Sequence, residues 1–135
     1  MQLTADSVEI LAKTRDASQA DATKRVLLRG QKRTGILDLS DTQIEDMGAF
    51  ADYAGIVNKY KGWDLSQNYI GQVPEDFKVH SRLPEIILAE NIFSNMLGFD
   101  GNMYLKILDL SNNQITKIEG LNDLPELRTL VISAD

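Results

Sequence analysis

The 135-residue sequence contains no cysteine, a single histidine and only three prolines. Extracellular proteins of this size commonly rely on disulfide bonds, so the absence of cysteine indicates a reducing, intracellular setting. The N-terminus carries no basic segment followed by an apolar one, and no run approaches the roughly 18 apolar residues that a membrane span needs. We therefore expect a soluble protein that is not secreted and has no membrane partner.

The first informative pattern is L-x-x-L-x-L-x-x-N-x-I, at residues 105–115. Leu108 and Leu110 alternate with Asp109, as on a short strand with one buried face. Asn113 follows at the bend, where an amide side chain can satisfy inward-turned backbone N–H and C=O groups at once. The pattern is typical of one turn of a leucine-rich repeat.

Copies of this turn occur along most of the chain, at steps of 26, 23, 22 and 22 residues between strand centres. Any single copy is also compatible with an ordinary buried strand. The regular steps favour a solenoid, as does an asparagine at the same place in three copies: Asn68, Asn91 and Asn113. We predict an α/β leucine-rich repeat solenoid with a curved parallel sheet, its strands centred near Leu37, Trp63, Ile86, Leu108 and Leu130.

The predicted organisation is a single leucine-rich repeat domain over residues 1–135. Residues 1–36 form an N-terminal cap and a basic segment, and residues 37–135 form about five repeats, of which the last is incomplete. No C-terminal cap follows Ile132, and a bare final repeat exposes strand and core edges. We therefore expect a truncated chain or a natural fragment.

Two helical segments are predicted. The N-terminal cap is a helix from Ala5 to about Asp16, with Thr4 as its N-cap and with Leu3 and Val8 spaced as a hydrophobic staple. The long return between the first two strands is predicted to carry a helix over residues 49–60. Its inward-facing residues are Phe50, Tyr53, Ile56 and Val57.

Residues between the leucine and asparagine positions are expected to face the concave surface of the sheet. Ile87, Ile107 and Val131 form a predicted apolar strip, beside an acidic field. Contiguous exposed apolar side chains usually mark an interaction surface, and an amphipathic helix with basic residues complements this one. The alternative is that these aliphatic residues reflect strand propensity alone. The predicted partner-binding residues are Asp38, Asp41, Asp64, Gln67, Glu85, Ile87, Glu90, Ile107, Asp109 and Val131.

The same residues give no support to catalysis. Asp64 and Asp109 lie two repeats apart, roughly 10 Å at a strand spacing of about 5 Å. His80 falls alone in a return, where a surface position is expected, and the sequence has no glycine-rich phosphate loop or metal-ligand spacing. We expect no enzyme activity, no catalytic residue, no metal and no cofactor.

The net charge of −6 is unevenly distributed. The segment through Thr34 contains seven basic and four acidic residues, whereas the rest of the chain contains seven basic and sixteen acidic residues. One cluster before the first strand contains no acid: Lys24, Arg25, Arg29, Lys32 and Arg33. Judged by charge alone, it is a solvated surface stretch.

Several motifs show a family likeness. The chain opens L-T-A-D at residues 3–6, carries L-R-G at residues 28–30 and contains W-D-L-S-Q-N-Y-I at residues 63–70. With its cap helix and short repeats, it resembles the A-prime subunit family of the spliceosomal U2 small nuclear ribonucleoprotein over most of its length. The L-R-G tripeptide belongs to the family's first strand, so here the segment is inserted or the first strand lies at residues 26–28. The family's capped final repeat is also missing.

The resemblance implies a non-catalytic nuclear scaffold for pre-mRNA splicing. Its concave face would embrace a helix of an RNA-recognition-motif protein, the B-double-prime subunit, so that the pair holds a stem-loop of U2 small nuclear RNA. The basic cluster would touch the RNA backbone only in this ternary complex, because the acidic remainder repels phosphate. The alternative is another intracellular repeat adaptor, such as the similar regulatory subunit of a nuclear phosphatase or an axonemal light chain.

Overall fold

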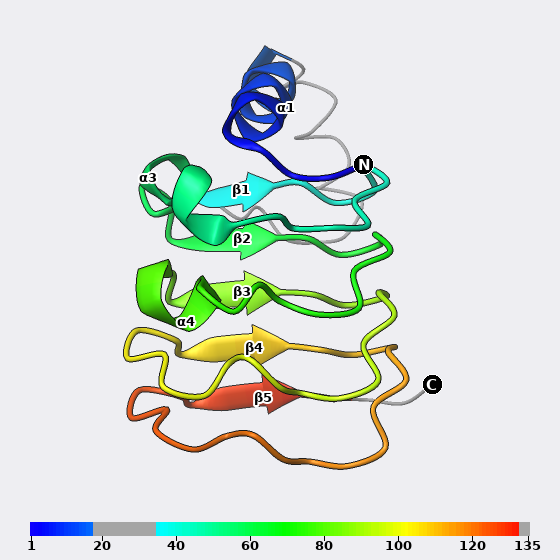
Figure 1. Ribbon diagram of the computed structural model, residues 1–135, viewed down its shortest axis with the longest axis vertical. Coiled ribbons are helices and arrows are strands. Elements are labelled where there is room, and N and C mark those ends of the chain that lie inside the picture. Colours follow the sequence, from blue (N-terminus) through cyan, green and yellow to red (C-terminus); the bar gives the residue numbers. More distant parts are fainter. Residues whose placement is uncertain (18–34, 133–135) are drawn as a thin grey trace.

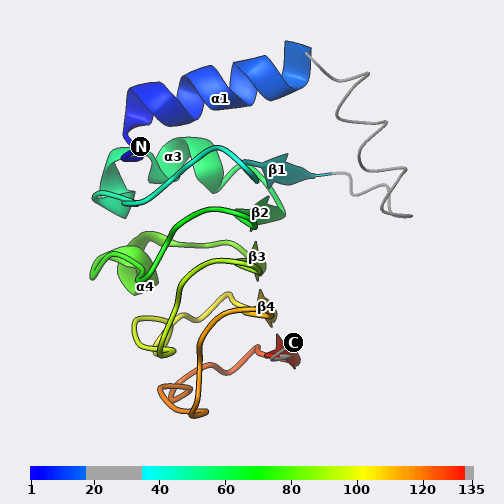
Figure 2. The same ribbon diagram turned by 90° about the vertical axis from the view of Figure 1, so that its right-hand side faces the viewer.

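The computed structural model describes residues 1–17 and 35–132. Its helices are α1 (Ala5–Ala17), the 3-10 helix η1 (Phe50–Asp52), α3 (Ala54–Val57) and α4 (Phe77–His80). Its strands are β1 (Ile36–Asp38), β2 (Gly62–Asp64), β3 (Glu85–Ile87), β4 (Ile107–Asp109) and β5 (Thr129–Val131). The strands form one parallel sheet in sequence order (Figure 1), and the returns stack on the side of the molecule opposite the strands (Figure 2). The predicted leucine-rich repeat solenoid is confirmed.

Each strand is centred on the predicted residue. Leu37 pairs with Trp63, and the same register continues through Ile86, Leu108 and Leu130. The first four of these side chains are buried, and that of Leu130 is half-buried. The strand at Leu37 is therefore present, whereas the alternative first strand at residues 26–28 lies outside the described residues.

The N-terminal helix has the predicted cap. The Thr4 Oγ1 accepts the backbone N–H of Ser7 at 3.1 Å, and the Ser7 Oγ accepts the backbone N–H of Thr4 at 2.7 Å. This reciprocal pair satisfies two of the donors that a helix start leaves free. Leu3 and Val8 are both buried in the core, as expected for a staple. Helix α1 thereby covers the β1 end of the solenoid (Figures 1 and 2).

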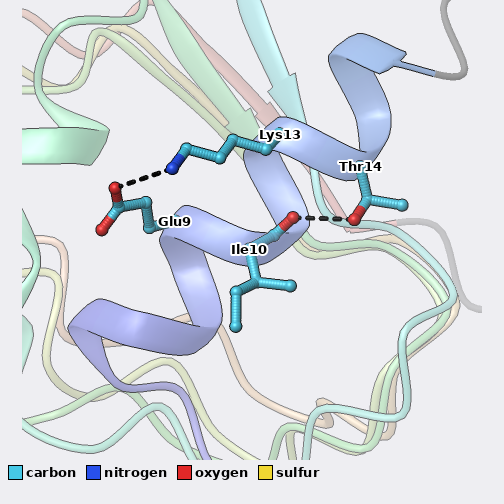
Figure 3. A network of polar contacts seen from close by, with 4 residues as sticks. All are labelled: Glu9, Ile10, Lys13 and Thr14. Atoms are coloured by element: carbon cyan, nitrogen blue, oxygen red, sulfur yellow. Dashed lines mark hydrogen bonds and ion pairs between the residues drawn. The ribbon is translucent and has the colours of Figure 1, made fainter.

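The opposite side of α1 faces solvent. Glu9 and Lys13 form an ion pair at 3.2 Å, and the Thr14 hydroxyl donates to the carbonyl oxygen of Ile10 at 2.8 Å (Figure 3). The Ile10 side chain is 63% exposed. These contacts are local to the helix, so α1 is attached to the repeats through its buried side.

The long return after β1 does not form the single helix predicted for residues 49–60. It consists of η1 and the one-turn helix α3, separated at Tyr53, whose φ of −130° and ψ of 7° interrupt the helix. The carboxylate of Asp76 in the next return accepts the N–H groups of Phe50 and Ala51 at 3.1 and 2.8 Å. A contact from the neighbouring repeat therefore stabilises a short 3-10 turn where the sequence favours a longer helix. Of the four residues predicted to point inward, three are buried and Ile56 is half-buried.

Aromatic rings from successive repeats form the centre of the core. Phe50 packs against Tyr53, Trp63 and Phe77 at ring-centroid distances of 5.2, 5.8 and 5.0 Å. Phe77 continues to Phe99 at 6.0 Å. The large Trp63 side chain thus fills the space that the long return opens, where other repeats need only Leu or Ile.

Tyr53 also satisfies its polar group inside this cluster. Its hydroxyl donates to the carbonyl oxygen of Met47 at 2.6 Å. Burial raises the pKa of Tyr53 well above its usual range, and the nearby carboxylates of Asp76, Asp46 and Asp52 act in the same direction. The hydroxyl therefore remains a protonated donor in the folded protein.

The three repeated asparagines point into the solenoid, as predicted. The Asn91 Oδ1 accepts the N–H of Ile70 at 3.0 Å, and its Nδ2 donates to the carbonyl oxygens of Leu65, Leu88 and Ala89 at 3.0–3.2 Å. Two of these partners belong to the preceding repeat, so the amide joins neighbouring turns. Equivalent networks surround the other two asparagines, Asn68 and Asn113.

Replacing Asn91 with alanine should lower the free energy of unfolding by about 1–3 kcal/mol, because four backbone groups lose their partner in a site that is only 6% exposed. Urea unfolding followed by circular dichroism measures the change. Gln114→Ala, at an exposed position, is the matched loss of an amide and should change stability little. Equal effects of the two substitutions would contradict the role of the buried amide.

Candidate protein-binding surface

The sheet presents two rows of side chains on its concave face. Strand pairing aligns one row through the first residue of each strand: Ile36, Gly62, Glu85, Ile107 and Thr129. It aligns the other row through the third residue: Asp38, Asp64, Ile87, Asp109 and Val131. We refer to these as the Ile36 row and the Asp38 row. Seven of the ten predicted partner-binding residues lie in them.

The three predicted apolar residues do not form a straight strip. Ile107 lies in the Ile36 row, whereas Ile87 and Val131 lie in the Asp38 row on the strands to either side of it. The result is a zigzag over β3, β4 and β5. Ile87 is 9% exposed, and Ile107 and Val131 are half-buried. Ile107 therefore offers more contact area to a partner than Ile87.

Ile36 is a face residue that the sequence reasoning missed. It neighbours Gly62 in the same row, and its Cδ1 lies 2.6 Å from where a Cβ of residue 62 would stand. Glycine at this position lets the Ile36 side chain lie across the sheet. Its alternation with the buried Leu37 was the signal that could have identified it.

The aspartates of the Asp38 row have a second role. The Oδ1 atoms of Asp38, Asp64 and Asp109 each accept a backbone N–H two residues later, at 2.9 Å. The donors are Ser40, Ser66 and Ser111. These bonds shape the turn that follows each strand. The tripeptide Asp-Leu-Ser occurs at all three places and was the available sequence signal.

The remaining predicted residues lie just beyond the strands. Asp41, Gln67 and Glu90 occupy equivalent positions, together with Asn112, and all four are exposed. Each has a left-handed backbone, with φ between 52° and 57°. The N–H groups of Asp41, Gln67 and Glu90 continue the ladder between repeats, as from Asp41 to the carbonyl oxygen of Ser66 at 3.0 Å. Polar side chains therefore line the edge of the face where the strands end.

The possible ligands of a metal ion do not cluster in the described part of the chain. No group of three potential metal-ligating side chains occurs among residues 1–17 and 35–132. Asp64 and Asp109 are separated by β3, with Ile87 between them in the Asp38 row. His80 is exposed at the end of α4, as predicted. Within the described part of the chain, no helix has the length and apolar character of a membrane span.

A further predicted surface cannot be placed. The five basic residues Lys24, Arg25, Arg29, Lys32 and Arg33 lie outside the described residues. Their position relative to the sheet therefore stays a prediction, and the candidate surface consists of the concave face and the edge at the strand ends.

Comparison with known families agrees with this geometry. A family model described as "Leucine Rich repeats (2 copies)" matches residues 105–135, a range that includes β4 and β5. No curated protein matches the chain. The match covers the last two strands, and the five-stranded parallel sheet shows the leucine-rich repeat solenoid fold. Repeats of this kind are in general protein-binding scaffolds and typically have no enzyme activity.

Replacing Asp109 with alanine should lower the free energy of unfolding by about 1 kcal/mol, because the N–H of Ser111 loses its acceptor. Asp109→Asn should cost less than half of this, since an amide oxygen can still accept that bond. Urea unfolding of both variants tests the difference. Equal losses would show that the charge, rather than the turn, determines the contribution of Asp109.

Proposed function

We propose that this chain is a non-catalytic scaffold that clasps a helix of an RNA-recognition-motif protein of the B-double-prime type on its concave face. The pair would then hold a stem-loop of U2 small nuclear RNA during pre-mRNA splicing in the nucleus. The leucine-rich repeat fold supports the scaffold role. The particular partner and location rest on the resemblance of the sequence to the A-prime subunit family.

One observation carries the helix-binding part of the proposal: apolar and acidic side chains share a regular, solvent-facing sheet. Ile107 lies between Glu85 and Thr129 in its own row and is next to Asp109 along β4. An apolar ridge of a helix can cover Ile107 and Val131 while basic residues beside that ridge approach the carboxylates. Both halves of the surface are therefore used by one amphipathic partner.

The N-terminal cap also supports the resemblance. The L-T-A-D opening of the family motif is where Thr4 caps α1 and Leu3 enters the core. The W-D-L-S-Q-N-Y-I segment supplies the buried Trp63, the turn-forming Asp64 and the bridging Asn68. These two motifs are thus structural parts of the N-terminal cap and of the second repeat, whereas L-R-G at residues 28–30 lies outside the described residues.

Ile107→Glu should weaken binding of a recombinant B-double-prime-type RNA-recognition domain by well over tenfold. The substitution removes an apolar side chain from the interface and places a charge in the groove. Isothermal titration calorimetry measures the affinity, and circular dichroism confirms that the variant is folded.

Ile118→Glu is the matched control, because Ile118 is 67% exposed and lies in a return rather than on the sheet. It should bind like the wild type. Wild-type affinity in Ile107→Glu would refute the concave face as the binding site. A pull-down from nuclear or axonemal extract tests the identity of the partner. Recovery of a phosphatase or a dynein heavy chain, rather than an RNA-recognition-motif protein, would contradict the proposed partner.

The basic cluster before the first strand is proposed to add RNA affinity only within the ternary complex. Replacing Lys24, Arg25 and Arg29 with serine should leave the protein–protein affinity unchanged and weaken RNA binding by the pair. The slope of log affinity against log salt should fall by about one for each phosphate that the protein no longer neutralises. Fluorescence anisotropy over a salt series measures both, and an unchanged slope would identify the cluster as a solvated surface stretch.

A further inference from the structure

A line of positive charge borders the concave face where the strands begin. Strand register places Lys61, Lys106 and Arg128 at equivalent positions, each one residue before its strand. Backbone bonds continue along this line, including Lys61 N–H to the Gly35 carbonyl oxygen at 2.7 Å and Arg128 N–H to that of Lys106 at 2.9 Å. All three side chains are exposed. We call Lys61, Lys106 and Arg128 the basic edge.

The opposite border of the same face is negative. Asp41 and Glu90 are exposed where the strands end, and Asp109 is half-buried at the last position of β4. We call Asp41, Glu90 and Asp109 the acidic edge. Ile107 lies between the two edges, and Ile87 and Val131 flank Asp109 in the Asp38 row. Along β4, the surface therefore changes from basic at Lys106 through apolar at Ile107 to acidic at Asp109.

The separation of the edges matches one helix. Lys106 and Asp109 are three positions apart along β4, which gives about 10 Å. Pro84 and Glu90 are six positions apart, which gives at most about 20 Å, because the chain turns at Glu90 after β3. An α-helix with its side chains is about 10–12 Å wide. Four strand spacings give a length of about 19 Å, or about 13 helical residues. A helix lying across the strands fits between the edges.

From these observations, and resting on the proposed function, we infer that the partner helix carries opposite charges on its two flanks. Acidic residues on one flank face the basic edge, and basic residues on the other face the acidic edge. Reversing the helix exchanges its flanks and places like charges together at both edges. The two edges therefore fix the direction in which the helix crosses the sheet, which the acidic field alone does not.

Two synthetic helical peptides of about 15 residues and identical composition test this inference with the full chain. In the first, glutamates on one flank and lysines on the other border an isoleucine ridge. In the second, the same charges alternate along both flanks. Circular dichroism checks equal helix content, and fluorescence anisotropy should show that the first peptide binds at least about tenfold more tightly.

The outcomes separate the inference from the function on which it rests. Equal binding of both peptides, abolished for both by Ile107→Glu, would overturn the charged-edge inference and leave helix binding intact. Binding of neither peptide, or binding unaffected by Ile107→Glu, would overturn helix binding by this face and the inference with it.

Single substitutions address the basic edge directly. Lys106→Glu should weaken binding of the charge-segregated peptide about fivefold and of the alternating peptide much less. Lys117→Glu makes the same charge change at an exposed position outside the strands and should have no effect. Equal effects of the two substitutions would overturn the assignment of the edge.

Direction is measured with a spin label on the peptide N-terminus. Paramagnetic broadening should affect one end of the sheet only, near β1 and β2 or near β5. Exchanging every glutamate with every lysine in the peptide should move the broadening to the other end. Broadening at both ends, or at the same end for both peptides, would show that the edges do not set the direction.

Discussion

The structure depends on one inward side-chain amide in each of three successive repeats, at Asn68, Asn91 and Asn113. Each inward asparagine bonds backbone groups of its own bend and of the preceding turn, so it fixes the distance and the offset between neighbouring turns. A backbone that bends this sharply inside a core has no water to satisfy its polar groups. The amide supplies both a donor and an acceptor in the same place, which few side chains can do. The alignment of strands into rows, and hence the regular surface, follows from these buried bonds.

The sequence predicted the parts of the fold that each repeat determines for itself. Strand centres, inward asparagines and the capped first helix follow from local spacing and from the chemistry of single residues, and Leu37, Asn91 and Thr4 lie as expected. The helices in the returns were less predictable, because Asp76 of one repeat stabilises the N-terminus of η1 in another. Contacts of that kind depend on how turns stack, which no local pattern encodes.

The candidate surface likewise has features that the sequence of one repeat predicts and features that depend on contacts between repeats. Alternation along the strands indicated which side chains face outward, and the predicted residues of the strands do lie in the two rows. The zigzag follows from the predicted strand centres, because Ile87 and Val131 come one residue after a centre and Ile107 one residue before it. The reach of Ile36 across Gly62 emerged only in three dimensions. The aspartates of the Asp38 row likewise combine charge with turn formation, so their presence on the surface is not evidence of binding alone.

The left-handed residues at the strand ends have a consequence for the free energy of the folded backbone. Asparagine, aspartate and glycine adopt this backbone at low cost, whereas longer side chains adopt it at a cost of roughly 1–2 kcal/mol. Asn112 and Asp41 satisfy this preference, but Gln67 and Glu90 do not. Folding alone would favour smaller residues at the latter two positions. At Gln67 and Glu90, as at Gln43, the chain therefore keeps a long side chain at a cost in backbone free energy that asparagine, aspartate or glycine would avoid.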